Sequence, residues 1–205
     1  RPLAPNFGSL ITALSNGNST YHALQATLNK RLSRGVTILA NYTWSKMLDD
    51  ADDDFQMPSN PFNLQNEKGP SDFDLTHRFV ASYIWELPRL AAAGRLLRWT
   101  LGGWESNGII TLESGRWFSV FSGRDNSGSG LNRDRADIVG PLSMPAGRSK
   151  QQMLAEFFPR ASFAQNPPGT FGNSSRNLLR GPGYASVDLG LLKSFPVAEN
   201  HRVQF

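Results

Sequence analysis

The chain lacks cysteine, and it lacks any long run of apolar residues. A spanning helix needs roughly 20 consecutive apolar residues, so this absence and a mean hydropathy of -0.37 exclude a helical membrane protein. The absence of cysteine suits a chain that crosses an oxidising periplasm unfolded, although many cytosolic proteins share it. The sequence also has no initiator Met and no charged leader followed by an apolar segment, so we expect any export signal to lie upstream.

The residue patterns of common catalytic and cofactor sites are missing as well. His22, His77 and His201 are far apart, with no Cys and no His-x-x-x-His spacing, so we expect no metal centre, catalytic triad or cofactor and no enzyme activity. The glycine-rich stretch 126–130 does not join a strand to a helix, and turn chemistry explains it better than phosphate binding. Basic residues form no stripe interleaved with aromatics, which argues against nucleic-acid binding.

What the sequence does contain is alternation of polar and apolar residues with a period of two. The pattern is clearest at 21–32, where Leu24, Ala26 and Leu28 alternate with polar neighbours. Successive side chains of a strand point to opposite sides, so such a strand has one apolar and one polar face. The segments with this pattern are 21–32, 36–47, 77–87, 100–113 and 184–195, and 201–205 resembles the start of a further strand cut short.

The connections between these segments alternate in length. Residues 33–35, 88–99 and 196–200 are short connections, whereas 48–76 and 114–183 are long, the latter with one possible helix at 150–158. Outer-membrane barrels have short periplasmic turns and longer extracellular loops. The sequence therefore predicts an all-β fold, with residues 1–205 forming part of one antiparallel transmembrane β-barrel. A soluble, secreted, carbohydrate-binding β-sandwich is the alternative, but its strands usually have about five or six residues.

Membrane orientation gives each strand face an expected environment. The apolar set would face lipid, and its three lysines, Lys30, Lys46 and Lys193, lie near strand ends from which they can reach water. The expected aromatic girdle comprises Tyr42 and Trp44 near the outer interface and Trp85, Trp104 and Phe195 near the inner one. The expected lumen-facing polar residues either pair with one another, which we favour, or hold a plug; they are Gln25, Arg31, Arg78, Glu86, Glu105, Glu113 and Asp188.

The acidic residues cluster at the start of the first long loop. Between Asp49 and Thr76 there are eight acidic residues and one basic residue. Closely spaced carboxylates suit calcium, but the spacing and glycine of an EF-hand loop are missing. We therefore favour a solvated acidic loop over a calcium site. The calcium candidates are Asp49, Asp50, Asp52, Asp53 and Asp54.

Several phrases, taken together, resemble the TonB-dependent receptors with an Oar-like barrel, which are common in the outer membranes of soil bacteria. They occur in this order: Tyr21-His-Ala-Leu-Gln-Ala-Thr-Leu-Asn-Lys-Arg-Leu-Ser-Arg-Gly35, Asn41-Tyr-Thr-Trp-Ser-Lys46, Ser71-Asp-Phe-Asp-Leu-Thr-His-Arg-Phe79, Gly103-Trp104 and Leu179-Arg-Gly-Pro-Gly183. The resemblance implies a large barrel of about 22 strands around a plug, of which this chain would be about a quarter.

The resemblance also implies a function and partners. It implies import of a scarce small ligand, without chemistry, driven through TonB contacts made by N-terminal parts outside these residues. Outer-membrane lipid and lipopolysaccharide would surround the barrel, and extracellular loops would contact the ligand. A structural or adhesive outer-membrane barrel without transport remains the alternative. A plug and a TonB box in the complete gene would separate the two.

Overall fold

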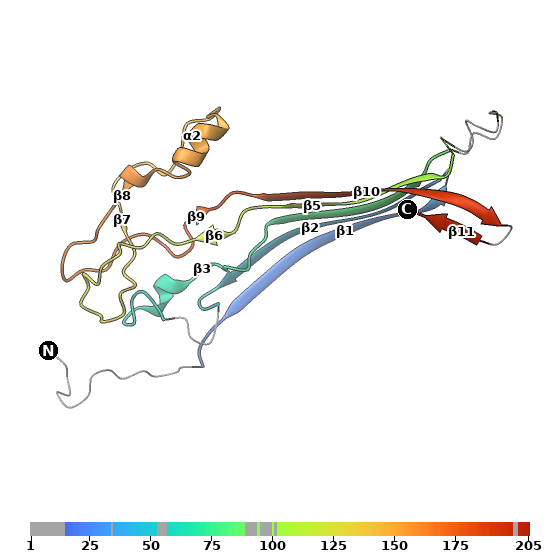
Figure 1. Ribbon diagram of the computed structural model, residues 1–205. Helices are drawn as coiled ribbons and strands as arrows, with labels where there is room; N and C mark the ends of the chain where they lie inside the picture. Colours follow the sequence, from blue (N-terminus) through green and yellow to red (C-terminus); the bar gives the residue numbers. More distant parts are fainter. Residues whose placement is uncertain are drawn as a thin grey trace.

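The computed structural model describes residues 15–33, 35–52, 57–88, 94, 100, 102–198 and 201–205. Long antiparallel strands dominate them (Figure 1). The strands of the main sheet are β1 (Ser19–Ser33), β2 (Val36–Asp49), β3 (Gly69–Pro70), β4 (His77–Glu86), β5 (Trp104–Glu113), β10 (Tyr184–Ala198) and β11 (His201–Gln204). Among the described residues, no helix is long and apolar enough to cross a membrane.

The main sheet is open and has the order β1-β2-β4-β5-β10-β11, with the short β3 beside β2. Along this order each strand comes later in the chain than the one before it, as in an up-and-down meander. Gly35 makes the turn between β1 and β2 at a φ of +78°, where a Cβ would also lie 2.5 Å from the Glu86 carbonyl oxygen. Only glycine suits that position.

Cross-strand register places the apolar sets of the five long strands on one face. One row of directly opposite residues crosses β1, β2, β4, β5 and β10, and it reads Leu28, Ala40, Ala81, Ile110 and Val187. The neighbouring row on the other face is mixed and reads Asn29, Leu39, Ser82, Ile109 and Asp188. A slip of one residue in any pairing would move a strand's apolar side chains to the opposite face.

The apolar face is not covered by protein. Leu28 is 62% exposed and Leu189 70% exposed, and among the described residues the only buried hydrophobic residue is Ala136. A β-sandwich needs a second sheet packed about 10 Å away on this face. The described residues form one sheet of long strands and no second large sheet that covers its apolar face. The β-sandwich alternative is therefore wrong.

The strand bounds differ from the sequence pattern mainly at the sheet ends. β1 and β10 have 15 residues and β2 has 14, whereas β4 and β5 have 10. β5 begins at Trp104 rather than at residue 100, and β4 ends at Glu86, before Pro88. Proline has no N–H for the ladder, which explains the early end of β4. Most of the 89–99 connection lies outside the described residues.

The two long connections gather at one end of the sheet and are folded (Figure 1). They contain η1 (Leu64–Glu67), α2 (Lys150–Ala155), η2 (Arg160–Ser162) and two small two-stranded sheets. The small sheets pair β6 (Trp117–Phe118) with β9 (Leu179–Arg180) and β7 (Asp137–Ile138) with β8 (Phe163–Ala164). A capping box starts α2, because Ser149 and Gln152 exchange side-chain and backbone hydrogen bonds. The second long connection is thus irregular backbone that joins short regular elements, and α2 lies within the 150–158 stretch where the sequence indicates a helix.

Candidate functional site

A buried polar cluster lies where the described parts of the two long connections meet, and Arg176 is its centre. The Arg176 guanidinium donates to the Asp49 carboxylate at 2.6 Å, to the Asp52 carboxylate, and to the backbone carbonyls of Asp49 and Glu67 at 3.0 and 3.1 Å. The side chains of Arg176 and Asp49 are only 2% and 1% exposed. We call these residues the Arg176 cluster.

In the Arg176 cluster, hydrogen bonds oppose the effect of burial on the pKa values of Asp52 and Arg176. Burial opposes ionisation of Asp52, but donors from the Ser71 hydroxyl, the Asp72 N–H and Arg176 outweigh it and hold the pKa of Asp52 below its ordinary value. Burial likewise opposes the charge of Arg176, yet the bonds to Asp49 and Asp52 raise its pKa. The cluster is therefore an internally paired unit in which two carboxylates share one guanidinium.

This geometry corrects the interpretation of the acidic run. The solvated acidic loop is wrong for Asp49 and Asp52, because both carboxylates are turned inward onto a guanidinium that arrives from a distant segment. Asp50 instead accepts from the Asn18 N–H at 2.7 Å. Asp53 and Asp54 lie outside the described residues. Within the described part of the chain, no three His, Cys, Asp or Glu side chains are grouped as a metal site would require.

A second buried arginine extends the contact between the loops. Arg135 forms an ion pair with Glu67 at 2.5 Å, with both side chains under 10% exposed, and donates to the Asn66 carbonyl at 2.9 Å. Burial lowers the pKa of Arg135, and the attraction of Glu67 only partly offsets it. Glu67 also accepts from the Ser59 N–H at 3.0 Å. The 57–70 segment is thus held by an arginine from the other long connection.

Two buried asparagines complete this loop assembly. Asn177 has a φ of 50° and donates from its amide to the Pro70 carbonyl at 2.7 Å and to Asp72 at 2.6 Å. Asn166 donates to Asp134 at 3.1 Å, and Asp134 also accepts from the N–H and hydroxyl of Ser127. Because the described interior is almost entirely polar, hydrogen bonds and ion pairs hold these loops in place.

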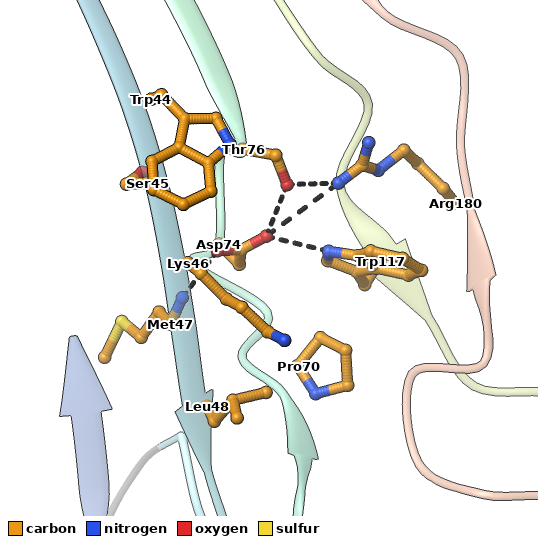
Figure 2. Close-up of a pocket in the computed structure, with 10 residues that line it drawn as sticks. All are labelled: Trp44, Ser45, Lys46, Met47, Leu48, Pro70, Asp74, Thr76, Trp117 and Arg180. Atoms are coloured by element: carbon orange, nitrogen blue, oxygen red, sulfur yellow. Dashed lines mark hydrogen bonds and ion pairs between the residues drawn. The ribbon is translucent and has the colours of Figure 1, made fainter. Parts of the chain in front are cut away.

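Beside this assembly, Asp74 organises the end of β2. Its carboxylate accepts from the Met47 N–H at 2.7 Å, the Thr76 hydroxyl at 2.9 Å and the Trp117 indole N–H at 2.8 Å. Arg180 lies 4.0 Å from the same carboxylate, donates to the Thr76 hydroxyl, and stacks 4.4 Å from the centre of the Trp117 ring. Figure 2 shows these side chains converging from β2, the 71–76 segment, β6 and β9.

A small open pocket of about 180 Å³ lies against these residues, and we call it the Trp117 pocket. Its exposed walls are almost wholly apolar, while Lys46 and Arg180 bring positive charge to it (Figure 2). The pocket is lined by Trp44, Ser45, Lys46, Met47, Leu48, Pro70, Asp74, Thr76, Trp117 and Arg180. A second, more open pocket of about 380 Å³ lies between residues 113–118 and 181–184 and includes Glu113, Arg116 and Tyr184.

The polar residues expected in the lumen share the sheet face opposite the apolar rows. Arg78 and Glu113 lie directly opposite each other and form an ion pair at 2.8 Å. Glu86 lies opposite Glu105, so mutual pairing cannot explain these two carboxylates. Gln25 lies opposite Thr43, Asp188 lies opposite Ile109, and Arg31 is in β1 beside a register irregularity. Their exposure to a lumen remains a prediction.

The expected girdle aromatics lie toward the two ends of the sheet. Tyr42 and Trp44 are near the loop end, where the Tyr42 hydroxyl hydrogen bonds with His77 Nδ1 at 2.8 Å. Trp85, Trp104 and Phe195 are near the other end, and Lys193 Nζ lies 4.7 Å from the Trp104 ring centre. Lys193 also donates to the carbonyls of Thr100 and Gly102, which satisfies a cation that is only 8% exposed.

Sequence reasoning missed the residues at the centre of the loop assembly. Arg135, Arg176, Asn166 and Asn177 occur in irregular stretches without periodicity, so nothing local marks them as buried. A weak signal was available for Arg180 and Asp74, because both fall in phrases that resemble a known family. Those phrases meet in the structure: Arg180, Asp74 and Lys46 all line the Trp117 pocket.

The whole chain, residues 1–205, matches the family described as outer membrane beta barrel domain. The chain belongs to this family. The prediction of an all-β, antiparallel outer-membrane barrel is therefore confirmed, and so is its localisation in the bacterial outer membrane. The open sheet is part of such a barrel, and the uncovered apolar rows are explained by lipid contact. No curated protein and no solved structure matches the chain.

Proposed function

We propose that this outer membrane barrel domain belongs to a TonB-dependent receptor with an Oar-like barrel, which binds a small ligand and imports it without chemistry of its own. The observation that carries the proposal is the loop assembly beyond one end of the sheet, where buried ion pairs fix two long connections next to a polar strand face. A preformed loop surface binds a ligand with little ordering cost. The phrases that resemble these receptors support the same assignment.

The elements of this proposal have distinct physical roles. The apolar rows face lipid, and the opposite face, with its Arg78–Glu113 ion pair, lines the lumen. The loops at the Arg176 cluster would be extracellular, and the turn at Gly35 periplasmic. Binding would occur on the loop assembly and at the second pocket, whose Glu113, Arg116 and Tyr184 combine both charges with an aromatic ring. TonB would supply the energy through parts of the protein outside the described sheet.

The test is energy-dependent uptake in a strain that carries the full protein. Exported metabolites and siderophore-type complexes labelled with a heavy isotope serve as the probe mixture, and the internalised compounds are identified by mass spectrometry. We expect at least one compound to accumulate only when both the protein and TonB are present. Equal accumulation without TonB would contradict import by this route. A deletion strain that carries the Asp52→Asn variant is compared in the same assay, because this change removes one carboxylate charge from the Arg176 cluster and so perturbs the loop assembly.

A structural or adhesive barrel is the second candidate, and a specific observation favours it. Large apolar side chains are strongly exposed on the loops, with Phe62 at 86% and Leu154 at 78%. Exposed apolar side chains mark a contact surface when they form a contiguous patch. Cell attachment that persists without TonB and falls when Phe62 and Leu154 are replaced by Ser would favour this candidate.

A further inference from the structure

The Trp117 pocket combines apolar walls with two positively charged side chains. Its apolar lining residues include Trp44, Trp117, Pro70 and Leu48. Two cations stand at the same pocket, Lys46 from β2 and Arg180 from β9. Apolar walls next to positive charge suit a ligand that has both an apolar body and an anionic group.

The charge balance at the pocket is positive. Asp74 is the nearby anion, and it is 3% exposed and already accepts three hydrogen bonds besides facing Arg180. Arg180 is therefore largely offset and positioned by Asp74, Thr76 and the Trp117 ring. Lys46 is exposed, and within the described residues it has no ion-pair partner. Figure 2 shows its side chain extending toward Pro70 and Trp117.

The position of the pocket fits a lipid ligand. Lys46 and Trp44 belong to the apolar, lipid-facing set of β2, and they lie at the end of the strand next to the long loops. This end corresponds to the outer leaflet when the long loops are extracellular. Tryptophan favours the headgroup level of a bilayer, and lysine there can reach a phosphate.

We propose that the Trp117 pocket binds the phosphate-bearing headgroup of an outer-leaflet glycolipid of the lipopolysaccharide type. Lys46 Nζ donates to the phosphate, and Asp74 and the Trp117 ring hold Arg180 in a fixed position beside it. The two indole rings contact the sugar and the start of the acyl chains. This inference concerns the fixation of the barrel in its membrane, so it stands independently of ligand import.

Lipid binding by the full protein in nanodiscs tests the proposal. The probes are lipid A with both phosphates, the same lipid without phosphates, and inorganic phosphate, and retained lipid is counted by native mass spectrometry. We expect Lys46→Gln to weaken retention of phosphorylated lipid A about fivefold to tenfold, the effect of one charge-assisted contact. Lys30→Gln is the matched control, because Lys30 is exposed on the same face near the opposite end of β1. Electrophoretic mobility before and after heating verifies that each variant is folded.

The arms of the experiment distinguish the possible ligands. Phosphorylated lipid retained more strongly than dephosphorylated lipid, with a loss specific to Lys46→Gln, supports the proposal. Equal losses for the two lysine variants would reveal only a general charge effect and overturn it. Equal retention of the two lipids would assign an apolar site that does not recognise phosphate. Displacement of the lipid by inorganic phosphate at comparable concentration would assign free phosphate as the ligand.

Discussion

Individual buried charges decide how the loops are built. Arg135 and Arg176 are buried with carboxylates in a region where Ala136 is the only buried hydrophobic residue among those described. Removing two charges from water costs about as much as their attraction returns, so such pairs contribute little net stability. They also favour this loop arrangement, because an arrangement that separates a pair and keeps either partner buried leaves that charge without its counterion.

The turn at Asp125 gives a residue-scale prediction of pH dependence. The Gly130 N–H, helped by donors from Ser129 and Ser127, lowers the pKa of Asp125 below its ordinary value of 3.8. A lowered pKa means that the ionised form favours the folded turn, so this stabilisation is present above the ordinary pKa and is lost as pH falls through the lower folded value. We expect amide protection at 127–131 to be constant above about pH 5 and to fall as the pH is lowered through and below the ordinary value of 3.8.

Hydrogen exchange followed by mass spectrometry, with times scaled for the intrinsic rate, measures this change. Amides of β2 in the same sample provide the internal reference. Asp125→Asn is expected to abolish the pH response of the 127–131 segment. Protection that stays constant over this range in the unchanged protein would show that the carboxylate does not hold the turn.

At the scale of elements, strand register determines on which face of the sheet each residue lies, and therefore whether it faces lipid or the lumen. Leu28 and Asn29 are neighbours in β1, yet Leu28 shares a row with Ala40 and Asn29 shares a row with Leu39 on the opposite face. The two rows differ in composition across β1, β2, β4, β5 and β10, because the pairings of these strands keep the alternation in phase at this level of the sheet. Adjacent residues at nearly equal membrane depth can therefore be compared directly.

Arginine placed at these two positions tests the lipid assignment. We expect Leu28→Arg to lower the free energy of unfolding by about 2–4 kcal/mol and Asn29→Arg to change it much less, because only the first places the charge in lipid. Denaturant unfolding in phospholipid vesicles, followed by tryptophan fluorescence, gives both values. A larger loss for Asn29→Arg would reverse the lipid and lumen faces.

The whole molecule consists of a sheet and a loop assembly that are held by different forces. In the sheet, backbone ladders and lipid contact dominate. In the assembly, Arg176 joins segments that are separated by 109 and 127 residues. Because one side chain bonds several segments at once, the assembly should open as a unit while the strands remain paired.

Arg176→Met tests this cooperativity at similar side-chain volume. Leaving Asp49 and Asp52 buried without their cation should cost the loops about 3–5 kcal/mol. We expect faster hydrogen exchange at both 57–70 and 171–177, with β2 and β4 unchanged. Arg116→Met, at an exposed arginine, is the matched control. Faster exchange confined to 171–177 would show that the segments open independently.

Whether a feature can be predicted from the sequence depends on the range of the interactions that determine it. Period-two alternation is local, since neighbouring side chains of a strand always point to opposite sides, and it was sufficient to predict the long strands near 21–32, 36–47 and 184–195. The lengths of the connections and the positions of the girdle aromatics can also be read from the sequence without knowledge of long-range contacts. The same reasoning failed at Asp49 and Asp52, where a run of like charges indicates a solvated loop unless a distant cation is known.

The sequence by itself therefore determined the faces of the sheet, the ends at which long and short connections lie, and the membrane as the surrounding medium. Only the tertiary structure decided which loop residues meet. Arg176, Arg135 and Asn177 find their partners across the two long connections, through contacts that no local period encodes. The physical reason is that a strand's environment follows from its own alternation, whereas an ion pair between loops depends on where the folded chain brings two distant side chains together.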